Sequence, residues 1–413
     1  PEPGLSVHKP KSWAAGIPGV GGGMADSWEK MGAARSVLTL KALNQPGGFD
    51  CPGCAWPEPS DHHIAEFCEN GMKAVAEEAT VRRLGPDFFK QHSVDDLRER
   101  PDYWLGQQGR LTHPVVVRPG SRHYEPISWD AAFSLIAGEL QALGSPGEAV
   151  FYTSGRTSNE AAFLYQLFVR SFGTNNLPDC SNMCHESSGS ALSETIGIGK
   201  GSVTLESLYQ ADLIMIAGQN PGTNHPRMLT ALEKARENGA HIVAINPLPE
   251  PGLMRFKNPQ KPRGVVGRGT QLAEQYLQLK VNGDLALFQA LNALLLEAED
   301  HAPGTVLDHA FIAEHTAGFD EFATAARQVD WADVAEATGL ARAEIEELAE
   351  RVLHSDRIVV CWAMGLTQHK NSVPTIREVV NFLLLRGNIG RIGAGVLPVR
   401  GHSNVQGDRT MGI

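Results

Sequence analysis

Residues 212–218 read DLIMIAG, an apolar run that ends in glycine and is followed by the polar turn QNPGTN at 219–224. A short apolar run bounded by turn residues is typical of a buried strand. We expect a helix from about His225 to Asn238, because Gly239 is suited to the position that follows a helix. A second apolar run, HIVAI, occupies residues 241–245. This strand–loop–helix–strand unit predicts a parallel sheet with helices on both faces.

Two further units of the same kind flank this one. Upstream, Ser128 can cap a helix whose apolar residues have helical spacing: Phe133, Ile136, Ala137, Leu140 and Leu143. A strand is expected at 149–152 and a helix from about Ser158 to Ser171. Downstream, we expect a strand at 357–361, a loop at 363–371 and a helix that ends near residue 387. The fold class is therefore α/β with parallel, Rossmann-like domains.

Ligands of such folds bind beyond the carboxyl ends of the strands. The segments expected there are Gly155, Gly218 to Pro221, Asn246–Pro247 and Met364 to His369. None of them has the G-x-G-x-x-G pattern, so the sequence does not support a nicotinamide dinucleotide site. The acidic stretch at 341–351 is predicted to be a solvated helix, and the Gly/Pro-rich residues 1–45 to be an irregular surface arm.

Composition limits the classes of partner and compartment. The chain has 413 residues, 42% of them hydrophobic and 20% charged, with a net charge of −11. An acidic chain with scattered Lys and Arg does not favour nucleic-acid binding. No apolar run is long enough to span a membrane. Six cysteines are too few for a secreted disulfide scaffold, so a cytoplasmic location is expected.

The most reactive chemistry is concentrated in DCSNMCHESSG at residues 179–189. In this segment Cys184 precedes His185 directly. A thiolate suits a transition metal, and an imidazole suits proton transfer. The alternative is that Cys184 packs in a core and His185 bonds a backbone carbonyl. Cys180, four residues earlier, and Cys361, within an expected strand, are interpreted as structural.

Taken together, the motifs resemble the molybdopterin oxidoreductase superfamily, and within it the FdhF/YdeP-type branch related to formate dehydrogenase alpha subunits. The resemblance rests on an ordered set of segments: CPGCAW at 51–56, NMCHE at 182–186, GQNP at 218–221, Gly283–Asp284, MGLTQH at 364–369, GNIGRIG at 387–393 and RGHSNVQG at 400–407. It extends from residue 51 to the end of the sequence.

The resemblance implies a domain plan. Residues 1–120 would form an amino-terminal arm and iron–sulfur lobe, 121–178 the first part of a split α/β domain, 179–396 an α/β molybdopterin-binding domain, and 397–413 a return into the split domain. It also implies that about half of the family chain lies outside these 413 residues, including a carboxy-terminal barrel.

The cofactor implied by the resemblance is bis-molybdopterin guanine dinucleotide with molybdenum or tungsten. Cys184 matches the protein ligand of the metal, His185 the proton acceptor and Arg400 an active-site arginine. A guanidinium can hold a small carboxylate with two hydrogen bonds. The expected cofactor-binding residues are Gly218, Asn220, Pro221, Asn246, Gly283, Asp284, Met364, Gly365, Gln368, Gly401, His402 and Asn404. Glycines would let the backbone approach the pterin, and Asp284 would accept hydrogen bonds from guanine.

The expected metal-cluster region departs from the family pattern. Cys51 and Cys54 fit, Glu58 occupies the third cysteine position, and Cys68 resembles the fourth. Asp61, His62 or His63 could supply a remaining ligand. A [4Fe–4S] cluster and a Cys3His zinc site both stay open. Asn70 occupies the position of a lysine that many relatives place between cluster and pterin.

The leading hypothesis is oxidation of formate by two-electron transfer, with an electron-transfer partner subunit. The pairing of Cys184–His185 with Arg400 favours formate over nitrate. Two alternatives remain: another reaction on a small substrate, or a pterin-fold subunit without catalytic activity. Metal content of the purified protein would separate the last alternative from the enzymes.

Overall fold

The computed structural model describes residues 9, 11–61, 63 and 65–413 and divides the chain into two compact units. Unit 1 comprises the described residues of Pro1–Val20 and Cys54–His62, together with Cys180–Ser403. Unit 2 comprises Gly21–Gly53, the described residues of His63–Asp179, and Asn404–Ile413. The division at residue 179 lies close to one expected domain boundary; the family-based domain plan itself stays a prediction.

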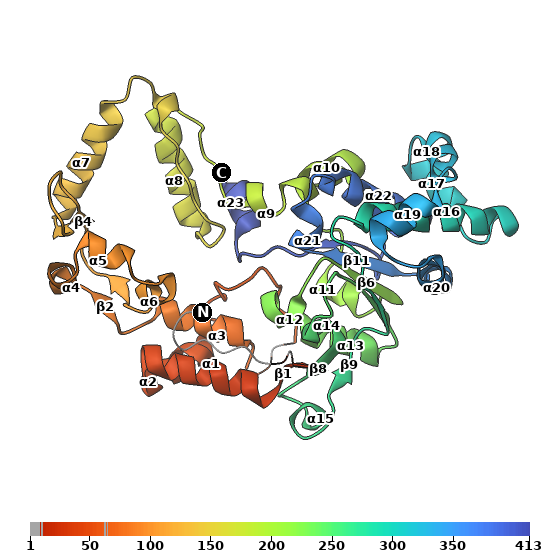
Figure 1. Cartoon of the computed structure of the whole chain (residues 1–413), viewed down its shortest axis with the longest axis horizontal. Coiled ribbons are helices and arrows are strands. Elements are labelled where there is room, and N and C mark those ends of the chain that lie inside the picture. Colours follow the sequence, from red (N-terminus) through yellow and green to blue (C-terminus); the bar gives the residue numbers. More distant parts are fainter. Residues whose placement is uncertain (1–8, 10, 62, 64) are drawn as a thin grey trace. The chain divides into compact units, whose positions relative to one another are not determined.

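A five-stranded parallel sheet organises unit 1, with strand order β10-β7-β6-β11-β12 (Figure 1). The central strands coincide with the apolar runs of the sequence. Their bounds are β6 Leu213–Ala217, β7 His241–Ile245, β10 Gln275–Leu277, β11 Ile358–Trp362 and β12 Gly395–Pro398. The predicted parallel α/β fold is confirmed for this unit.

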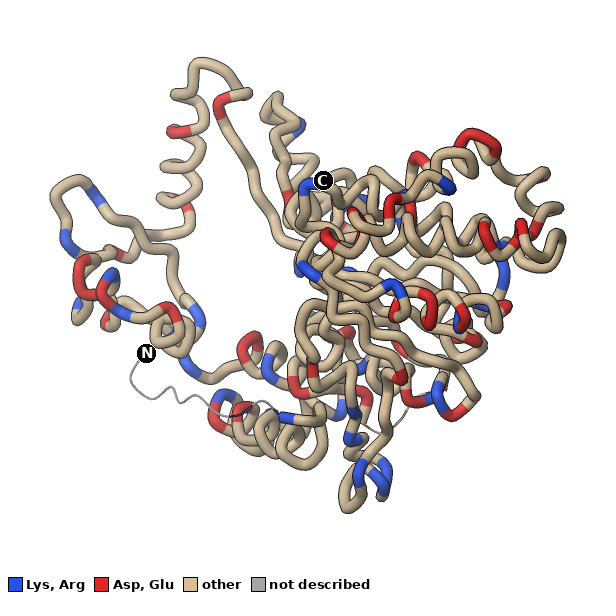
Figure 2. The backbone as a smooth tube through the Cα atoms, turned by 45° about the vertical axis from the view of Figure 1, so that its right-hand side comes forward, with Lys and Arg blue, Asp and Glu red and all other residues tan. Residues whose placement is uncertain are grey.

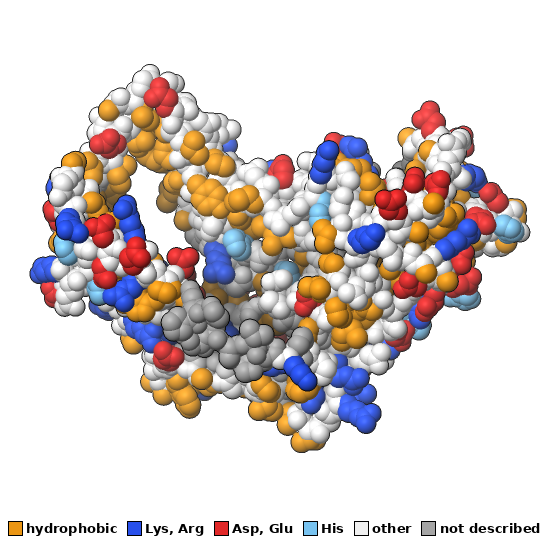
Figure 3. All heavy atoms as spheres, in the orientation of Figure 1, with side chains coloured by type: hydrophobic (Ala, Val, Ile, Leu, Met, Phe, Trp, Pro, Cys, Tyr) orange, Lys and Arg blue, Asp and Glu red, His pale blue; other side chains and the backbone are white. Residues whose placement is uncertain are grey.

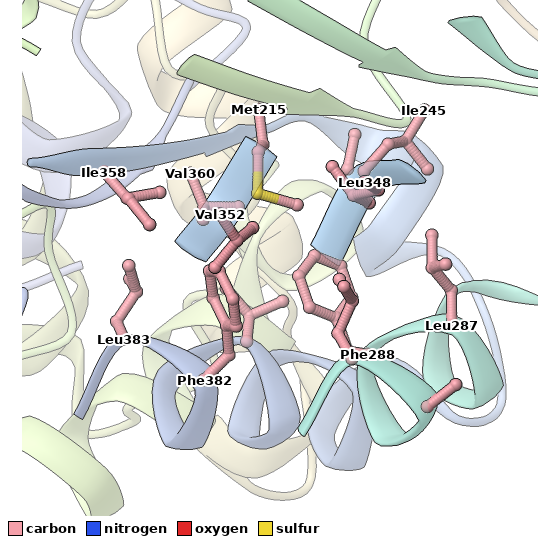
Figure 4. Packing of buried hydrophobic residues seen from close by; sticks show 14 of the residues in the cluster. Met215, Ile245, Leu287, Phe288, Leu348, Val352, Ile358, Val360, Phe382 and Leu383 are labelled. Atoms are coloured by element: carbon pink, nitrogen blue, oxygen red, sulfur yellow. The ribbon is translucent and has the colours of Figure 1, made fainter. Parts of the chain in front are cut away.

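Helices cover both faces of this sheet because alternate strand residues point to opposite sides. On one face, Met215 and Val360 pack with Phe288 of α16 (Asp284–His301) and Phe382 of α22 (Ser372–Leu385) (Figure 4). The centroids of these two phenylalanine rings lie 6.0 Å apart in an edge-to-face arrangement. On the other face, Ile214 and its alternating neighbours pack against α11 (Leu205–Leu208) and α13 (Met228–Glu237). All five side chains of β6 are buried, as expected for a central parallel strand.

The remaining elements of unit 1 are mostly short. Its helices are α9 Ser181–Cys184, α10 Glu186–Ile196, α11 Leu205–Leu208, α12 Pro221–Asn224, α13 Met228–Glu237, α14 Pro251–Met254, α15 Pro262–Val265, α16 Asp284–His301, α17 His309–His315, α18 Phe319–Ala326, α19 Trp331–Thr338, α20 Arg342–Leu353, α21 Met364–Thr367 and α22 Ser372–Leu385. A small sheet joins β1 Ala14–Ala15, β8 Arg255–Lys257 and β9 Thr270–Gln271. The helix expected from His225 begins only at Met228, after a separate turn of helix.

Unit 2 is largely helical. Its elements are α2 Ala33–Ala42, α3 Glu69–Glu78, β2 Arg83–Leu84, α4 Pro86–Gln91, α5 Val94–Arg98, α6 Asp102–Gly106, β3 Arg110–Leu111, β4 Val115–Val116, β5 Glu125–Pro126, α7 Trp129–Gln141, the 3-10 turn Pro146–Glu148, α8 Asn159–Phe172 and α23 Val405–Met411. The expected cap is present, since the Ser128 hydroxyl accepts a hydrogen bond from the Ala131 amide.

Among the helices of the described residues, none combines the length and the apolar character that crossing a membrane requires.

Two local expectations were wrong. The Gly-rich residues 16–31 form helix α1, Gly16–Met31, rather than an irregular arm. A Cβ on Gly23 would lie 2.8 Å from the Met72 sulfur, so glycine lets that side chain pack directly on the helix backbone. Residues 149–152 form no strand, and only an isolated bridge joins Thr153 to Asp179. The backbone of this segment is partly satisfied in other ways, since the Phe151 amide donates to the Asn176 carbonyl at 2.9 Å and the Ala149 carbonyl accepts from the Asn176 side chain at 3.1 Å.

Unit 2 carries many exposed apolar side chains on α7 and α8 (Figure 3). On α7, Trp129 and Phe133 are 64% and 62% exposed, and on α8 Leu164 is 64% exposed. The apolar spacing that predicted α7 is thus real, but much of its apolar stripe faces solvent in the described structure.

Candidate functional site

The candidate site lies in unit 1, beyond the carboxyl ends of the parallel strands. Four strands deliver polar loops to this edge: β6 leads into Gly218, β7 into Asn246, β11 into Met364 and β12 into Arg400. Because parallel strands all end at the same edge, these loops converge there. The sequence predicted the loops after β6, β7 and β11, but not strand β12 before Arg400. The expectation that Gly155 ends a strand of the same kind was wrong, because no strand precedes it and it belongs to unit 2.

The loop that follows β11 holds the Cys184 turn at this edge. The Thr367 hydroxyl donates to the Cys184 carbonyl, and the Gln368 amide donates to the Met183 carbonyl at 3.0 Å. The Ser187 hydroxyl returns a hydrogen bond to the Thr367 carbonyl at 3.1 Å. Cys184 is partly exposed, whereas Cys180 is buried. Of the two neighbouring thiols, Cys184 is therefore the one available to a ligand.

His185 is buried, and both of its ring nitrogens have partners. Nε2 lies 3.0 Å from the Val399 carbonyl oxygen, and Nδ1 lies 3.0 Å from the Ser188 hydroxyl. The Trp362 indole N–H donates to the same hydroxyl at 2.9 Å. Since a carbonyl only accepts, Nε2 carries the proton, and the Ser188 hydroxyl donates to Nδ1. Burial, with the nearby Arg400 charge, lowers the pKa of His185 to about 3.

Arg400 is buried beside this histidine. Its guanidinium donates to the His185 carbonyl at 3.3 Å and to the Gly199 carbonyl at 3.0 Å. The Arg400 carbonyl accepts from Nε2 of His225 at 2.8 Å, and burial lowers the pKa of His225. The structure thus brings Cys184, His185 and Arg400 together, three residues that the sequence grouped only by resemblance.

The glycines of this edge serve loop packing. Gly218 has a φ of +57°, and a Cβ there would lie 2.7 Å from the Gly365 backbone. The Gly365 amide donates to the Gly218 carbonyl at 3.0 Å. Glycine at both positions lets the β6 and β11 loops touch. Contact between the two loops is therefore one physical reason for glycine at both positions, and the expectation that these glycines admit a pterin stays a prediction.

Two of the expected polar cofactor-binding side chains, Asn246 and Asp284, are buried, whereas a third, Asn220, caps a helix. Asn246 is buried, and its amide donates to the Leu248 carbonyl at 2.9 Å. Asp284 is buried at the start of α16 directly after Gly283, and burial raises its pKa to about 6. By contrast, Asn220 uses its side-chain oxygen to cap α12, accepting from Thr223 at 3.2 Å. The following Pro221 is buried as the first residue of that helix.

Three residues of the carboxy-terminal motif divide between the units. Gly401 and His402 belong to unit 1 with Arg400, whereas Asn404 belongs to unit 2. In unit 2 the Asn404 side-chain amide donates to the Thr157 carbonyl at 2.7 Å, and the Asn404 backbone amide donates to the Gly155 carbonyl at 2.6 Å.

Met364, another expected cofactor-binding residue, is the first residue of α21 and is 40% exposed.

Sequence reasoning missed several residues of the site. Ser188 and Trp362, which fix the histidine tautomer, were not singled out, nor was the anchor Thr367. Ser188 lies three residues after His185, which is the N-cap residue of α10, and this spacing could have revealed it. Gln219 lies in a segment expected at the ligand edge but was not among the expected cofactor-binding residues. Its side-chain oxygen is buried without a hydrogen-bond partner among the described residues. Such an orphaned acceptor at a ligand edge is a group that a bound molecule could satisfy.

The three cysteines of the expected metal cluster belong to different units. In unit 2, the thiols of Cys51 and Cys68 both face Gly71, where a Cβ would lie 3.0 Å and 3.8 Å from the two sulfurs. Cys54 belongs to unit 1, where it contacts the apolar cluster around Trp56, and burial raises its pKa.

Other candidate ligands have partners of their own. The carboxylate of Glu58, which occupies the third cysteine position, lies 3.7 Å from the Arg227 guanidinium. The His63 ring nitrogen Nδ1 is hydrogen-bonded to the Glu66 carboxylate at 2.8 Å. His62 lies outside the described residues. Across the residues that the structure describes, no group of three or more Cys, His, Asp or Glu side chains is arranged to hold a metal ion. The [4Fe–4S] and zinc alternatives remain predictions.

The chain is similar in sequence to known proteins. Residues 110–411 match the family model described as molybdopterin oxidoreductase. The chain is 61% identical over its whole length to an uncharacterized oxidoreductase of Mycobacterium tuberculosis strain H37Rv, and covers 53% of that protein. It is 46% identical over 93% of its length to protein YdeP of Escherichia coli K12, covering 51% of it. The chain thus spans about half the length of these curated relatives.

More distant likenesses point the same way. Formate dehydrogenase H of Escherichia coli K12 is 30% identical over 73% of this chain, which covers 40% of that enzyme. Acetylene hydratase from Pelobacter acetylenicus has a similar fold, with a TM-score of 0.56 and 20% identity over 69% of this chain and 36% of that one. The second likeness concerns the fold alone.

Proposed function

The chain belongs to the molybdopterin oxidoreductase family, and we propose that it forms part of a molybdenum or tungsten enzyme that oxidises formate to carbon dioxide. One observation carries the proposal. A partly exposed thiol, Cys184, lies at the carboxyl edge of the sheet, next to a histidine whose carbonyl receives the buried Arg400 guanidinium. A soft ligand and a permanent cation side by side suit a metal and a small anionic substrate.

The residues present fit the family cofactor. Cys184 would bind the metal, and the loops at Gly218, Gly365, Gly401 and His402 would line the pterin. Gln219 offers a buried acceptor that lacks a protein partner among the described residues. We propose that Asn246 and Asp284 bind the guanine of a bis-guanine-dinucleotide form, since both are buried polar groups at the same sheet edge. When bound, the cofactor would supply two-electron redox chemistry.

The chain's own groups have separate parts in this proposal. Arg400 orients the formate carboxylate, because its charge does not depend on pH in the working range. Oxidation of formate releases one proton and two electrons, and His185 was expected to accept the proton. With Nε2 on Val399 and Nδ1 on Ser188, His185 can do so only after releasing one of these partners. Electrons would leave to a partner subunit.

The test is an assay of the full-length polypeptide with formate and a dye acceptor, next to nitrate, after metal analysis. We expect molybdenum or tungsten in the purified protein and turnover with formate. Cys184→Ala should abolish turnover with little loss of stability, since the thiol is partly exposed. Cys180→Ala is the matched control and should keep turnover.

Other outcomes identify the alternatives. Turnover of nitrate alone would reject formate in favour of another small substrate. Protein that binds pterin but contains neither metal would favour a non-catalytic subunit. Equal activity in Cys184→Ala and wild type would contradict the ligand assignment.

A further inference from the structure

A basic hairpin projects from unit 1 away from the candidate site (Figures 1 and 2). We define it as residues Arg255–Gln271, in which β8 and β9 pair antiparallel and α15 lies in the loop between them. Its charges are all positive: Arg255, Lys257, Lys261, Arg263 and Arg268. The whole segment from residue 251 to 273 contains no acidic residue, although the chain has a net charge of −11.

The base of the hairpin is fixed by a buried carboxylate. Glu233 on α13 is 2% exposed and accepts hydrogen bonds of 2.7 Å from both Asn258 and Thr270, one on each side of the loop. Lys261 adds an ion pair to the same carboxylate at 3.1 Å. Phe256, also buried, anchors β8 in the core. A carboxylate that joins both arms of a loop holds the loop in one shape.

Close backbone packing fixes the tip as well. A Cβ on Gly264 would lie 2.0 Å from the Asn258 carbonyl oxygen, and one on Gly269 would lie 2.4 Å from that of Phe256. Only glycine allows these approaches, and Gly269 also has a φ of +73°. The hairpin is therefore a preorganised projection, and a partner would not need to pay for ordering it.

The tip presents apolar surface between cations. Val266 is 88% exposed and Val265 41% exposed, and the exposed Arg263 and Arg268 flank them in sequence. Within the described residues, no carboxylate lies within ion-pair distance of these two arginines or of Arg255. Arginine is enriched at protein–protein interfaces, and an exposed apolar patch with polar residues around it is typical of an interaction site.

We propose that the basic hairpin is a docking site for a partner protein that presents a cluster of Asp and Glu side chains around a small apolar spot. Complementary charge would guide the encounter, and the valines would contribute contact once the surfaces meet. Nucleic acid is the less favoured occupant, because the acidic body of the chain repels phosphates and valines gain little from them. This inference does not depend on the formate reaction.

The experiment measures binding of a fluorescently labelled acidic peptide with a Leu-Phe centre to the whole chain by anisotropy. In low salt, the double variant Arg263→Glu, Arg268→Glu should weaken binding at least tenfold. The control double variant Lys90→Glu, Arg98→Glu makes the same change in net charge at residues 72% and 75% exposed on unit 2, and should weaken binding less than threefold. Val266→Ser should weaken binding about threefold in high and low salt alike.

Three results would overturn the proposal. The first is equal weakening by the two double variants, which would reduce the effect to net charge. The second is an unchanged peptide affinity in Val266→Ser, which would show that the valine makes no contact with the peptide. The third is tighter binding of a single-stranded DNA of equal charge through the same arginines, which would make the hairpin a phosphate-binding surface. Because Val266 and both arginines are exposed, these variants are expected to fold.

Discussion

His185 is held by a chain of hydrogen bonds that runs from Trp362 through Ser188 to its ring and on to Val399. Each donor in this chain meets an acceptor, so the ring has one tautomer and one orientation. A fixed imidazole next to Cys184 also fixes the direction of the neighbouring peptide groups. The alternative weighed for the sequence, a histidine that satisfies a backbone carbonyl, describes the observed arrangement.

Ser188→Ala tests this network. The change leaves the Trp362 indole N–H and Nδ1 of His185 buried without partners, which costs about 1–3 kcal/mol of unfolding free energy. We expect a lower thermal midpoint for Ser188→Ala and an almost unchanged one for Ser193→Ala, an exposed serine on the same helix. Equal midpoints for the two variants would show that the network does not form.

At the scale of the element, a carboxylate near the end of α16 binds the backbone amides of the loop that follows. Glu299 is 6% exposed and accepts from the backbone amides of Gly304, Val306 and Leu307, and from His309. Although burial opposes it, the hydrogen bond from His309 and those from the three amides lower the pKa of Glu299 to about 2. One side chain thus organises the loop between α16 and α17.

The lowered pKa predicts a dependence of stability on pH. The unfolded chain binds a proton on Glu299 near pH 4.5, whereas the folded chain does so only near pH 2. Its stabilisation, on the order of 2–3 kcal/mol, is therefore present above pH 4.5 and lost as the pH falls toward 2. The difference in thermal midpoint between wild type and Glu299→Gln should shrink between pH 6 and pH 3. Glu297→Gln, at an exposed position on α16, should show no such trend.

At the scale of the whole molecule, the two units differ in how completely they bury apolar residues. The sheet of unit 1 has helices on both faces, whereas α7 and α8 of unit 2 expose several large side chains. Exposed apolar surface of this extent is a binding or aggregation surface. The chain also spans about half the length of its curated relatives.

We expect the 413-residue chain to bind an environment-sensitive hydrophobic dye in its folded state. Phe133→Ser combined with Phe168→Ser should lower the dye fluorescence by about half and leave the thermal midpoint within a few degrees, because both rings are about half exposed or more. Glu139→Ser on α7 is the control and should leave dye fluorescence unchanged. Undiminished fluorescence in the double variant would place the dye-binding surface elsewhere.

Wherever a short-range pattern decides the structure, the sequence predicted it well. The apolar runs at 213–217, 241–245 and 358–362 became the central strands, because a run of that length has to be buried on both sides. Their order in the chain, alternating with helices, was sufficient to predict a parallel sheet, which is confirmed, while the binding of a ligand at its carboxyl edge stays a prediction. Family motifs then identified Cys184 and Arg400 as neighbours.

Only the tertiary structure decided the details that depend on distant partners. Met72 packs against Gly23 in helix α1, and residues 149–152 form no strand, with the Phe151 amide bonded to the distant Asn176 carbonyl and one isolated bridge at Thr153. His185 is buried and neutral, and both of its ring nitrogens have hydrogen-bond partners. One partner is the distant Val399 carbonyl, and the other is the Ser188 hydroxyl, which the equally distant Trp362 holds in place. Local pattern determines what a segment buries, but hydrogen bonds and burial across the sheet determine which atoms of a site remain available for chemistry.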